Sequence, residues 1–383
     1  MLPKDAQIIS VDDHVIEHPS VWQDRLPAKY KDVGPKLVFD KVNGDHWEID
    51  GEPHGNFALN AVAGKPREAF GMDPTSYDEM RDGCHDVHER IKDMDIEGVW
   101  AELNFPNMPG FAGSGFSTLK DKDLAYVCVQ AYNDFILDEW CPAYPDRLIP
   151  LTILPYWDSM ERQVAEIHRT ADKGTKSIAY LEAPHRLGIG LPSWHSDHWN
   201  PLLQAVQDRD LPLSVHFGSG GFPLGISDEG LSTKFPVTIT SFGFNSAYAA
   251  TELIWSPIFD NYPGVKFVLS ESGIGWVPYV LERADYVWER HRSYNDVNQD
   301  VKPSDRWYSN MYAPFIADDA GLEARHRVGV ENIMFESDYP HSDCNWPHTR
   351  KMLEESLANV PDDEARLIAE GNARRVYNFP RQA

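Results

Sequence analysis

The sequence predicts an α/β fold in which parallel strands alternate with helices and close into an eight-stranded (β/α)8 barrel. Short apolar runs of strand character recur along the 383 residues, and segments with helical periodicity separate them. Several of these runs end abruptly in an acid or a histidine. Alternation of this kind implies parallel pairing with right-handed crossovers, and eight strands close a parallel barrel.

Eight apolar runs are predicted to form the barrel strands. The last run is followed by a turn proline and a histidine, as expected where a buried strand reaches a polar rim. The predicted strands are Gln7–Val11, Gly98–Phe105, Leu148–Leu154, Ser177–Glu182, Pro212–Phe217, Lys266–Glu271, Trp307–Tyr312 and Asn332–Asp338.

Segments between these runs show the spacing of amphipathic helices. An apolar residue recurs at i, i+3, i+4, i+7 and i+11 after the second strand, which predicts one buried stripe. A second segment, after the sixth strand, mixes aromatic and charged residues. The apolar positions are Leu124, Val127, Cys128, Ala131 and Phe135 in the first segment and Tyr279, Leu281, Tyr286 and Trp288 in the second.

Residues 16–75 are too long for an ordinary connection and are predicted to be an insertion after the first strand. Within them, Leu37–Asp40 and Asp45–Asp50 flank an Asn-Gly pair, a strong hairpin signal, so we expect a small antiparallel flap over one barrel mouth. The apolar, Gly-rich loop 106–119 either lines a substrate pocket or packs on the surface. No linker divides the sequence, so residues 1–383 are expected to form a single domain.

Composition narrows the function classes. A formal net charge of −25 argues against nucleic-acid binding, because neutralising phosphates requires clustered Lys and Arg. The four cysteines have no CxxC spacing, which argues against a zinc–thiolate site and a disulfide framework. The N-terminal residues lack a signal-peptide pattern, and no run approaches the ~20 apolar residues of a membrane span. We expect a cytoplasmic protein with no membrane partner.

Polar residues lie at the C-terminal ends of five predicted strands. In a parallel barrel such residues converge on one mouth, whereas interior positions are apolar. Asp12 and His14 are two residues apart, so on an extended chain their side chains point to the same side. The set comprises Asp12 and His14 at the end of the first strand, Glu182 at the end of the fourth, His216 at the end of the fifth, Glu271 at the end of the sixth, and Asp338 at the end of the eighth with His341 on the turn beyond it.

Taken singly, each of these residues has an ordinary explanation, such as a capped turn or a hydrogen-bonded core histidine. Taken together they do not, because burying several carboxylates near one another is strongly unfavourable without a cation. The mixture of imidazoles and carboxylates exceeds the needs of one tetrahedral zinc and matches paired iron or manganese. We predict two divalent metals, iron first, with manganese or zinc as alternatives. Glu17, His185 and His195 are supporting or substrate-contacting candidates, and Tyr180 and Trp346 are expected in the wall or core.

The motifs resemble the amidohydrolase superfamily, in particular the branch related to aminocarboxymuconate-semialdehyde decarboxylase. The resemblance extends from residues 8–14 to residues 372–377 and implies a distorted (β/α)8 barrel. Family ligands are an HxH motif after strand one, a carbamylated Lys or a Glu after strand four, a His after each of strands five and six, and an Asp after strand eight. The resemblance implies ligands here at Asp12-x-His14, Glu182, His216 and Asp338.

This sequence departs from the family pattern in two places. Asp12 stands at the first histidine of HxH, and Glu271 replaces the strand-six histidine. Anionic oxygen thus replaces neutral nitrogen, which favours harder, redox-capable metals. With these exchanges the chain looks similar to dinuclear non-haem iron monooxygenases of this fold. We place one metal on Asp12, His14, Glu182 and Asp338 and the other on Glu182, His216, Glu271 and His341, with Glu182 bridging and Asp338, His341 and Glu182 as candidate catalytic groups.

Three functions remain open on this basis. The leading one is hydroxylation of a small or terpenoid-like substrate by a diiron or iron–manganese centre, with O2 as co-substrate. The alternative is metal-dependent hydrolysis or non-oxidative decarboxylation of a small carboxylate or amide, in which Asp338 or His341 shuttles protons. The third is a catalytically idle barrel that serves as a partner subunit. For the enzyme functions we expect a small-molecule substrate and a homo-oligomer, dimer or higher.

Overall fold

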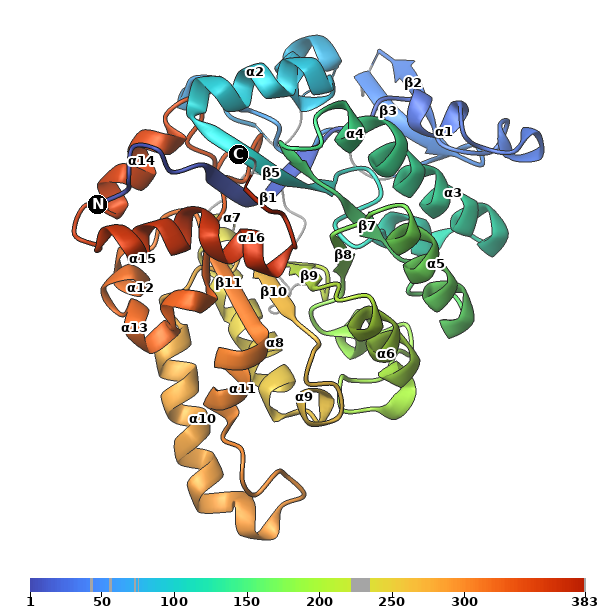
Figure 1. Cartoon of the computed structure of the whole chain (residues 1–383). Helices are drawn as coiled ribbons and strands as arrows, with labels where there is room; N and C mark the ends of the chain where they lie inside the picture. Colours follow the sequence, from blue (N-terminus) through green and yellow to red (C-terminus); the bar gives the residue numbers. More distant parts are fainter. Residues whose placement is uncertain (42–43, 55–56, 72–73, 75, 222–234, 382–383) are drawn as a thin grey trace. The chain divides into compact units, whose positions relative to one another are not determined.

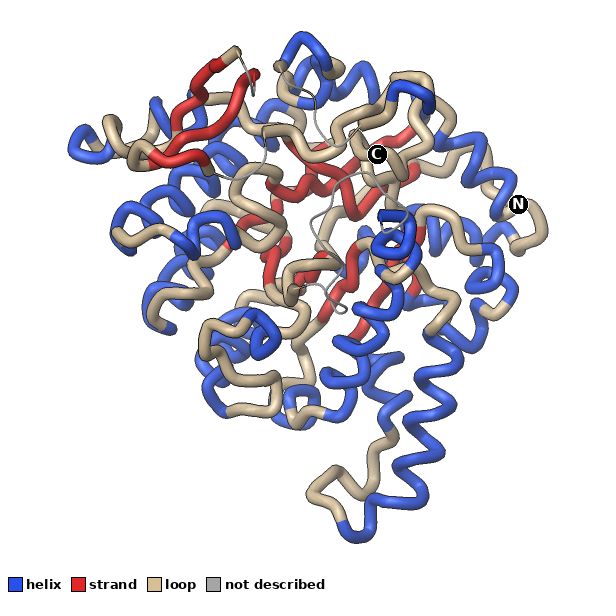
Figure 2. The backbone as a smooth tube through the Cα atoms, turned by 180° about the vertical axis from the view of Figure 1, so that it is seen from behind, coloured by secondary structure: helices blue, strands red, loops and turns tan. Residues whose placement is uncertain are grey.

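The computed structural model describes residues 1–41, 44–54, 57–71, 74, 76–221 and 235–381. Within them, strands and helices alternate as predicted, with mainly parallel strands and one small antiparallel sheet (Figures 1 and 2). The strands are β1 Ile8–Val15, β2 Lys36–Asp40, β3 Gly44–Ile49, β4 Glu52–Pro53, β5 Val99–Pro106, β6 Leu148–Ile149, β7 Leu151–Ile153, β8 Ser177–Tyr180, β9 Leu213–His216, β10 Phe267–Ser270, β11 Met311–Phe315 and β12 Ile333–Phe335.

Helices fill most of the segments between the parallel strands. Among the described residues, none of them combines the length and the apolar character that crossing a membrane demands. The helices are α1 Ser20–Gln23, α2 Val87–Glu97, α3 Lys122–Phe135, α4 Cys141–Ala143, α5 Met160–Asp172, α6 Asn200–Asp208, α7 Phe235–Thr240, α8 Phe242–Trp255, α9 Ile258–Asn261, α10 Val277–His291, α11 Pro303–Asn310, α12 Asp319–Glu323, α13 Arg325–Val328, α14 Thr349–Ser356, α15 Asp362–Arg366 and α16 Asn372–Val376.

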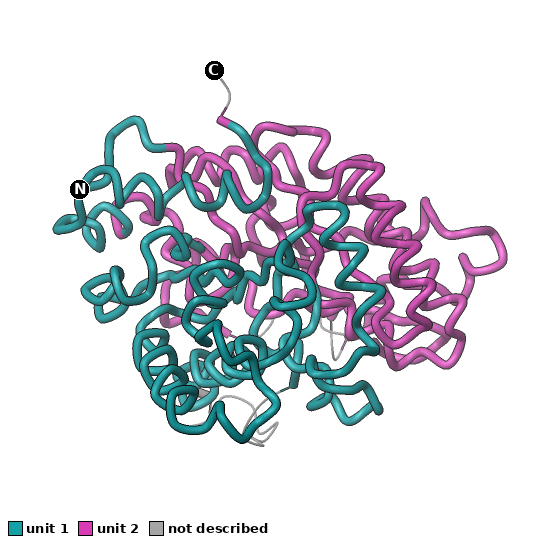
Figure 3. The backbone as a smooth tube through the Cα atoms, turned by 60° about the horizontal axis from the view of Figure 1, so that its bottom comes forward, with its two compact units in different colours: residues 1–6, 180–336, 353–380 teal, residues 7–179, 337–352, 381–383 magenta. Residues whose placement is uncertain are grey.

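The chain forms two compact units (Figure 3). Unit 1 contains residues 1–6, 180–336 and 353–380, and unit 2 contains residues 7–179, 337–352 and 381–383. Each unit draws on distant parts of the sequence. Organisation as a single domain with residues 16–75 inserted stays a prediction.

In unit 2, β5 pairs in parallel with β1 and with β6, and β7 pairs in parallel with β8. Every residue of β1 is buried, as expected for a strand of a parallel sheet. The register between β1 and β5 shifts between Ser10 and Asp13, so the strand bulges just where its acids begin. A bulge re-aims the side chains that follow it and is common beside active sites.

The third predicted strand, Leu148–Leu154, is two short strands, β6 and β7. Pro150 separates them, because proline has no backbone N–H to donate to a ladder. The predicted hairpin is confirmed: β2 and β3 pair antiparallel, with Lys36 opposite Glu48, and β3 continues to β4. Asn43 of its turn lies outside the described residues.

In unit 1, β9, β10, β11 and β12 form a parallel ladder in that order. Ser270 at the end of β10 pairs with His216 at the end of β9, so these two strands stop at the same level. Helix α10 confirms the predicted helix after the sixth strand, and α11 lies beside it (Figure 1).

The predicted strand Trp307–Tyr312 is wrong over most of its length. Residues 307–310 belong to α11, and the strand β11 begins only at Met311. The helix is started by Pro303 in its first turn and by Asp305, whose carboxylate accepts a hydrogen bond from the backbone N–H of Lys302 at 3.2 Å. These start signals outweigh the aromatic, strand-like composition of the segment.

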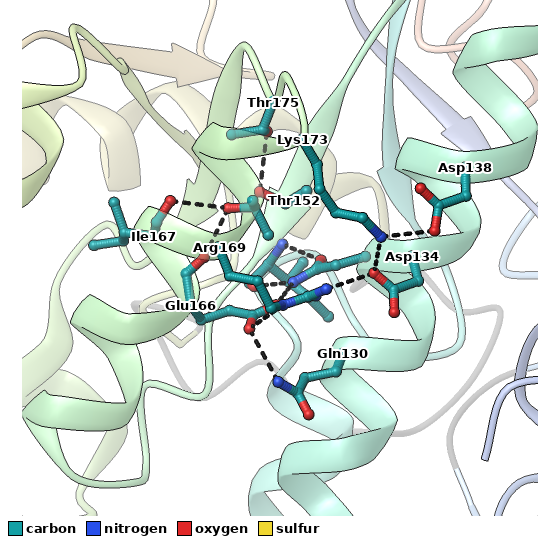
Figure 4. A network of polar contacts seen from close by, with 12 residues as sticks. Gln130, Asp134, Asp138, Thr152, Glu166, Ile167, Arg169, Lys173 and Thr175 are labelled. Atoms are coloured by element: carbon teal, nitrogen blue, oxygen red, sulfur yellow. Dashed lines mark hydrogen bonds and ion pairs between the residues drawn. The ribbon is translucent and has the colours of Figure 1, made fainter. Parts of the chain in front are cut away.

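A polar network joins α3 and α5 within unit 2 (Figure 4). The carboxylate of Glu166, which is fully buried, accepts hydrogen bonds from Asn133 Nδ2 at 2.7 Å and from Arg169 Nη2 at 2.7 Å. Arg169 also reaches Asp134 at 2.5 Å, and Lys173 pairs with Asp134 at 2.6 Å. Each buried charge in this network therefore has an opposite charge from the protein itself.

Candidate metal centre

The first two predicted ligands lie within β1 rather than after it. Asp12 and His14 are both fully buried, and His14 Nε2 is 3.6 Å from Asp12 Oδ1. They lie in the C-terminal half of the strand, next to the register shift between Ser10 and Asp13. An acid and an imidazole at this separation can share one cation.

Residues 337–341 run alongside this end of β1, although more than three hundred residues separate the two segments in the sequence. Ser337 N donates to Ser10 Oγ at 2.8 Å, and Asp338 N donates to the Asp12 carbonyl at 2.8 Å. His14 N in turn donates to the Tyr339 carbonyl at 2.7 Å. These backbone contacts hold the two ligand-bearing segments side by side.

Asp338 and His341 complete the group in unit 2. Asp338 Oδ1 is 3.2 Å from His14 Nε2 and 2.8 Å from His341 Nδ1, and the two imidazole rings are tilted by 34° with centroids 4.0 Å apart. Asp338 adopts a left-handed backbone conformation with φ of 60°, which turns its carboxylate toward both rings. Burial acts to raise the pKa of Asp338, but His341 and His14 outweigh it and hold that pKa below its usual range.

This group fits a bound metal. His14, Asp338 and His341 each offer a ligand atom, and the three atoms lie within 4.8 Å of one another. Asp338 Oδ2 and His341 Nε2 are buried and have no hydrogen-bond partner among the described residues. Buried atoms of this kind are strongly disfavoured unless something binds them. Carboxylate and imidazole donors suit manganese, iron or zinc.

Unit 1 holds a second pair of predicted ligands. His216 Nε2 is 3.5 Å from Glu271 Oε2, and His216 Nδ1 lies 2.7 Å from the Phe217 carbonyl. With Nδ1 donating to that carbonyl, Nε2 is the ring nitrogen that can act as an acceptor or a ligand. Glu271 has a φ of 56°, and its backbone N–H donates to Glu336 Oε2 at 2.9 Å.

Glu182, the predicted bridge, has one carboxylate oxygen bound by the protein. Its Oε2 accepts hydrogen bonds from Gly218 N at 2.9 Å, Gly220 N at 3.3 Å and Asn245 Nδ2 at 3.0 Å. Its Oε1 is buried without a hydrogen-bond partner among the described residues. Burial raises the pKa of Glu182 to about 8. The carboxylate thus holds the loop that follows β9, with one oxygen left over for a ligand.

The supporting candidates fall into different environments. Glu17 is buried and accepts hydrogen bonds from Asn107 N and Met108 N, both at 2.9 Å, so it anchors the start of the 106–119 loop. Burial raises the pKa of Glu17 to about 7. His185 Nδ1 lies 3.5 Å from Glu252 Oε1. His195 is exposed, Tyr180 is buried as expected, and Trp346 donates to the Asp93 carbonyl at 3.2 Å.

Sequence reasoning missed several residues that shape the site. Arg90 is buried against β1, Asn245 from α8 holds Glu182, and Glu336 holds the backbone of Glu271. Only Arg90 had a signal in the sequence, because it follows the apolar spacing of its helix and precedes Ile91 on the buried side.

A family model described as "Amidohydrolase" matches residues 21–379. The fold and the His and carboxylate cluster thus define a metal-binding enzyme class, and the chain belongs to the amidohydrolase family. Among curated proteins it is similar to the gamma-resorcylate decarboxylase of Polaromonas sp. strain JS666, with 23% identity over 79% of this chain and 91% of the relative.

Two solved structures confirm the barrel fold. An amidohydrolase from Mycobacterium avium subsp. paratuberculosis K-10 superimposes with a TM-score of 0.73, 18% identity, and coverage of 98% of this chain and 100% of that chain. The 5-carboxyvanillate decarboxylase of Novosphingobium aromaticivorans DSM 12444, solved with manganese, gives a TM-score of 0.66, 18% identity, and coverage of 98% and 96%. The predicted α/β TIM-barrel class is therefore correct.

The predicted function is wrong in its leading form. The curated relatives are decarboxylases, and these do not support an O2-dependent non-haem iron monooxygenase. Manganese in the related structures supports a metal cofactor but not a pair of irons or O2. The two exchanges of histidine for carboxylate at Asp12 and Glu271 changed the charge of the ligand set, and charge alone does not assign redox chemistry.

Proposed function

We propose that the chain is a metal-dependent, non-oxidative decarboxylase of a small aromatic carboxylate. One observation carries the proposal: His14, Asp338 and His341 gather buried ligand atoms within 4.8 Å, in a family whose matched curated relatives are decarboxylases. Asp338 Oδ2 and His341 Nε2 have no hydrogen-bond partner among the described residues, so each can bind a cation or a substrate.

Decarboxylation requires fewer reactants at the site than hydroxylation does. The bond between the ring carbon and the carboxylate breaks, CO2 leaves, and the electron pair stays on the ring carbon until a proton arrives. No oxidant, reductant or O2 enters the balance. The protein must orient the carboxylate, exclude water and place a proton.

The residues around His14 can perform these tasks. A divalent metal bound there would supply positive charge that binds the anionic substrate and withdraws electron density. His341, held by Asp338 through Nδ1, presents Nε2 as the position from which a proton moves to the ring carbon. Phe105 and Phe111 lie with ring centroids 6.0 and 5.3 Å from that of His14, so the site has an apolar wall against which an aromatic ring can pack.

The proposed ligand set in unit 2 is Asp12, His14 and Asp338: His14 Nε2 lies 3.6 Å from Asp12 Oδ1 and 3.2 Å from Asp338 Oδ1. His341 lies beside this set as the proposed proton donor. Glu182, His216 and Glu271 in unit 1 stay predicted ligands. Manganese is the first metal to test, because it is present in a related decarboxylase structure. Binding of a second ion would be measured in the same titration.

The test uses metal-free protein reloaded with Mn²⁺, Zn²⁺ or Fe²⁺ under argon. Candidate substrates are 2,6-dihydroxybenzoate and 5-carboxyvanillate, which related decarboxylases are named for. Release of CO2 in equal amount to the decarboxylated phenol, with deuterium at the vacated carbon in D2O, is expected. Absence of turnover across a panel of aromatic carboxylates with every metal, or a product that forms only with O2, would overturn the proposal.

A further inference from the structure

A buried arginine lies directly behind the ligand-bearing end of β1. Arg90, on α2, is fully buried. One of its terminal nitrogens, Nη2, donates to the carbonyl of His14. Its Nε lies 3.3 Å from Glu102 Oε1 on the neighbouring strand β5. A guanidinium that binds the backbone of a candidate metal ligand can fix the position of that ligand's side chain.

The same guanidinium also contacts the second ligand-bearing segment. Arg90 Cζ lies 4.3 Å from the ring centroid of Tyr339, the residue next to Asp338. Tyr339 is itself fixed at both ends: its N–H donates to Asp13 Oδ1 at 3.0 Å and its hydroxyl donates to Asp93 Oδ2 at 2.6 Å. Arg90 therefore holds the backbone of His14 and the ring beside Asp338 at the same time.

The buried carboxylates near Arg90 require a positive charge, which its guanidinium supplies. Asp13, Glu97 and Glu102 are all nearly fully buried, and each interacts electrostatically with Arg90. A planar guanidinium can pair with a carboxylate, donate to a carbonyl and stack on a ring at once, whereas a lysine ammonium cannot stack or fork in this way. The geometry suits arginine and no other residue.

We propose that Arg90 is a positioning residue for the metal centre. By fixing the His14 carbonyl and the Tyr339 ring in one place, it sets the separation of His14 Nε2 and Asp338 Oδ1, now 3.2 Å, and thereby the affinity for the metal. The inference rests on the proposed function, because that function supplies the metal.

The test is a Mn²⁺ titration of the full chain, with free Mn²⁺ measured by its EPR signal. Arg90→Lys keeps the positive charge but loses the fork and the stack. We expect its Kd for Mn²⁺ to rise by about tenfold or more, the range found for partners that orient metal ligands, and the EPR signal of bound Mn²⁺ to change. Melting of the metal-free protein reports folding separately.

Arg306→Lys is the matched control. Arg306 is also buried, donates to the carbonyls of Ile254 and Ser256 at 2.9 and 3.1 Å, and pairs with Asp260. Its substitution should lower stability and leave the Mn²⁺ Kd within twofold. An equal rise in the Mn²⁺ Kd for both variants would mean that Arg90 affects metal binding only through the stability of the fold. That result would overturn the inference.

Glu102→Gln covers the case in which Arg90→Lys does not fold. It removes the anion that orients Arg90 Nε but keeps the guanidinium, so a smaller rise in Kd, about threefold, is expected. An unchanged Kd in folded Arg90→Lys, or in Glu102→Gln where the first variant does not fold, contradicts the inference. Failure of the unsubstituted protein to bind Mn²⁺ removes the proposed function instead, so the two failures are distinguishable.

Discussion

Two regions of unit 2 bury carboxylates in opposite ways. Between α3 and α5, Glu166 is buried and is paired with Arg169, and the neighbouring Asp134 is paired with Arg169 and Lys173 (Figure 4). Beside β1, Asp338 is just as buried, yet its neighbours are the imidazoles of His14 and His341, and its Oδ2 has no hydrogen-bond partner among the described residues.

The contrast separates a structural cluster from a binding site. A buried charge that the protein neutralises itself contributes to holding elements together. A buried charge with an unsatisfied oxygen is expected where a ligand completes it. Removing a charge should therefore mainly lower stability between α3 and α5, and mainly lower metal binding beside β1.

The largest expected effect comes from Asp338→Asn. Decarboxylation should fall by roughly 10³-fold, the upper range for loss of one group that stabilises a transition state, and tight Mn²⁺ binding should be lost. The metal-free variant should lose little stability, because removal of an unsatisfied buried oxygen offsets the weaker contacts with His14 and His341. Turnover assays, metal analysis and melting curves measure the three quantities. A large loss of stability in the metal-free variant would place Asp338 with the structural charges.

Arg169→Met tests the other side of the comparison. It leaves Glu166 buried without its cation, so the free energy of unfolding should fall by about 3 kcal/mol. Urea denaturation measures this, and the Mn²⁺ affinity should not change. Asp138→Asn is the control: Asp138 is 53% exposed at the end of the same network, and its loss should change stability by less than ~0.5 kcal/mol. Equal losses in both variants would contradict the assignment.

Adding metal should stabilise only a protein with an intact centre. Mn²⁺ at 100 times its Kd is expected to raise the free energy of unfolding by about 2.7 kcal/mol, because it binds the folded state alone. Arg169→Met should gain the same increment despite its lower starting stability, and Asp338→Asn should gain none. Denaturation with EDTA and with Mn²⁺ gives the difference. If Mn²⁺ stabilises Asp338→Asn as much as the unsubstituted protein, the metal does not bind to this carboxylate.

The smallest expected effect is a pH dependence at Glu97, which is buried and accepts a hydrogen bond from Thr349 Oγ1 at 2.6 Å. Burial raises the pKa of Glu97 from 4.5 to about 8. Because the folded pKa is the higher one, the contribution of Glu97 to stability is complete below pH 4.5 and is lost as the pH rises toward 8. Glu97→Gln resembles the protonated acid and should lack this loss.

Between pH 5 and 8, the metal-free unsubstituted protein should therefore lose on the order of 2 kcal/mol more stability than Glu97→Gln. Urea denaturation at intermediate pH values across this interval would trace the difference. Parallel pH profiles for the two proteins would show that the folded-state pKa of Glu97 is close to its unfolded value.

Local patterns in the chain were enough to predict much of the architecture. Apolar runs and helical spacing identified the α/β class and the helices α3 and α10, and an Asn-Gly signal located the hairpin of β2 and β3. The acids and histidines of the candidate site could also be identified in the sequence, because several carboxylates at the ends of buried strands are unfavourable without a cation. Their roles as ligands stay predictions. These properties depend on residues close to one another along the chain.

Contacts between distant segments could not be obtained in this way. The bulge in β1, the approach of residues 337–341 to Asp12 and His14, and the insertion of Arg90 behind them each depend on packing between segments far apart in sequence. The lack of a hydrogen-bond partner for Asp338 Oδ2 among the described residues likewise depends on which segments pack around it. Side-chain periodicity specifies which face of an element is buried, but which groups then meet, and which are left unpaired, is settled only when the elements pack.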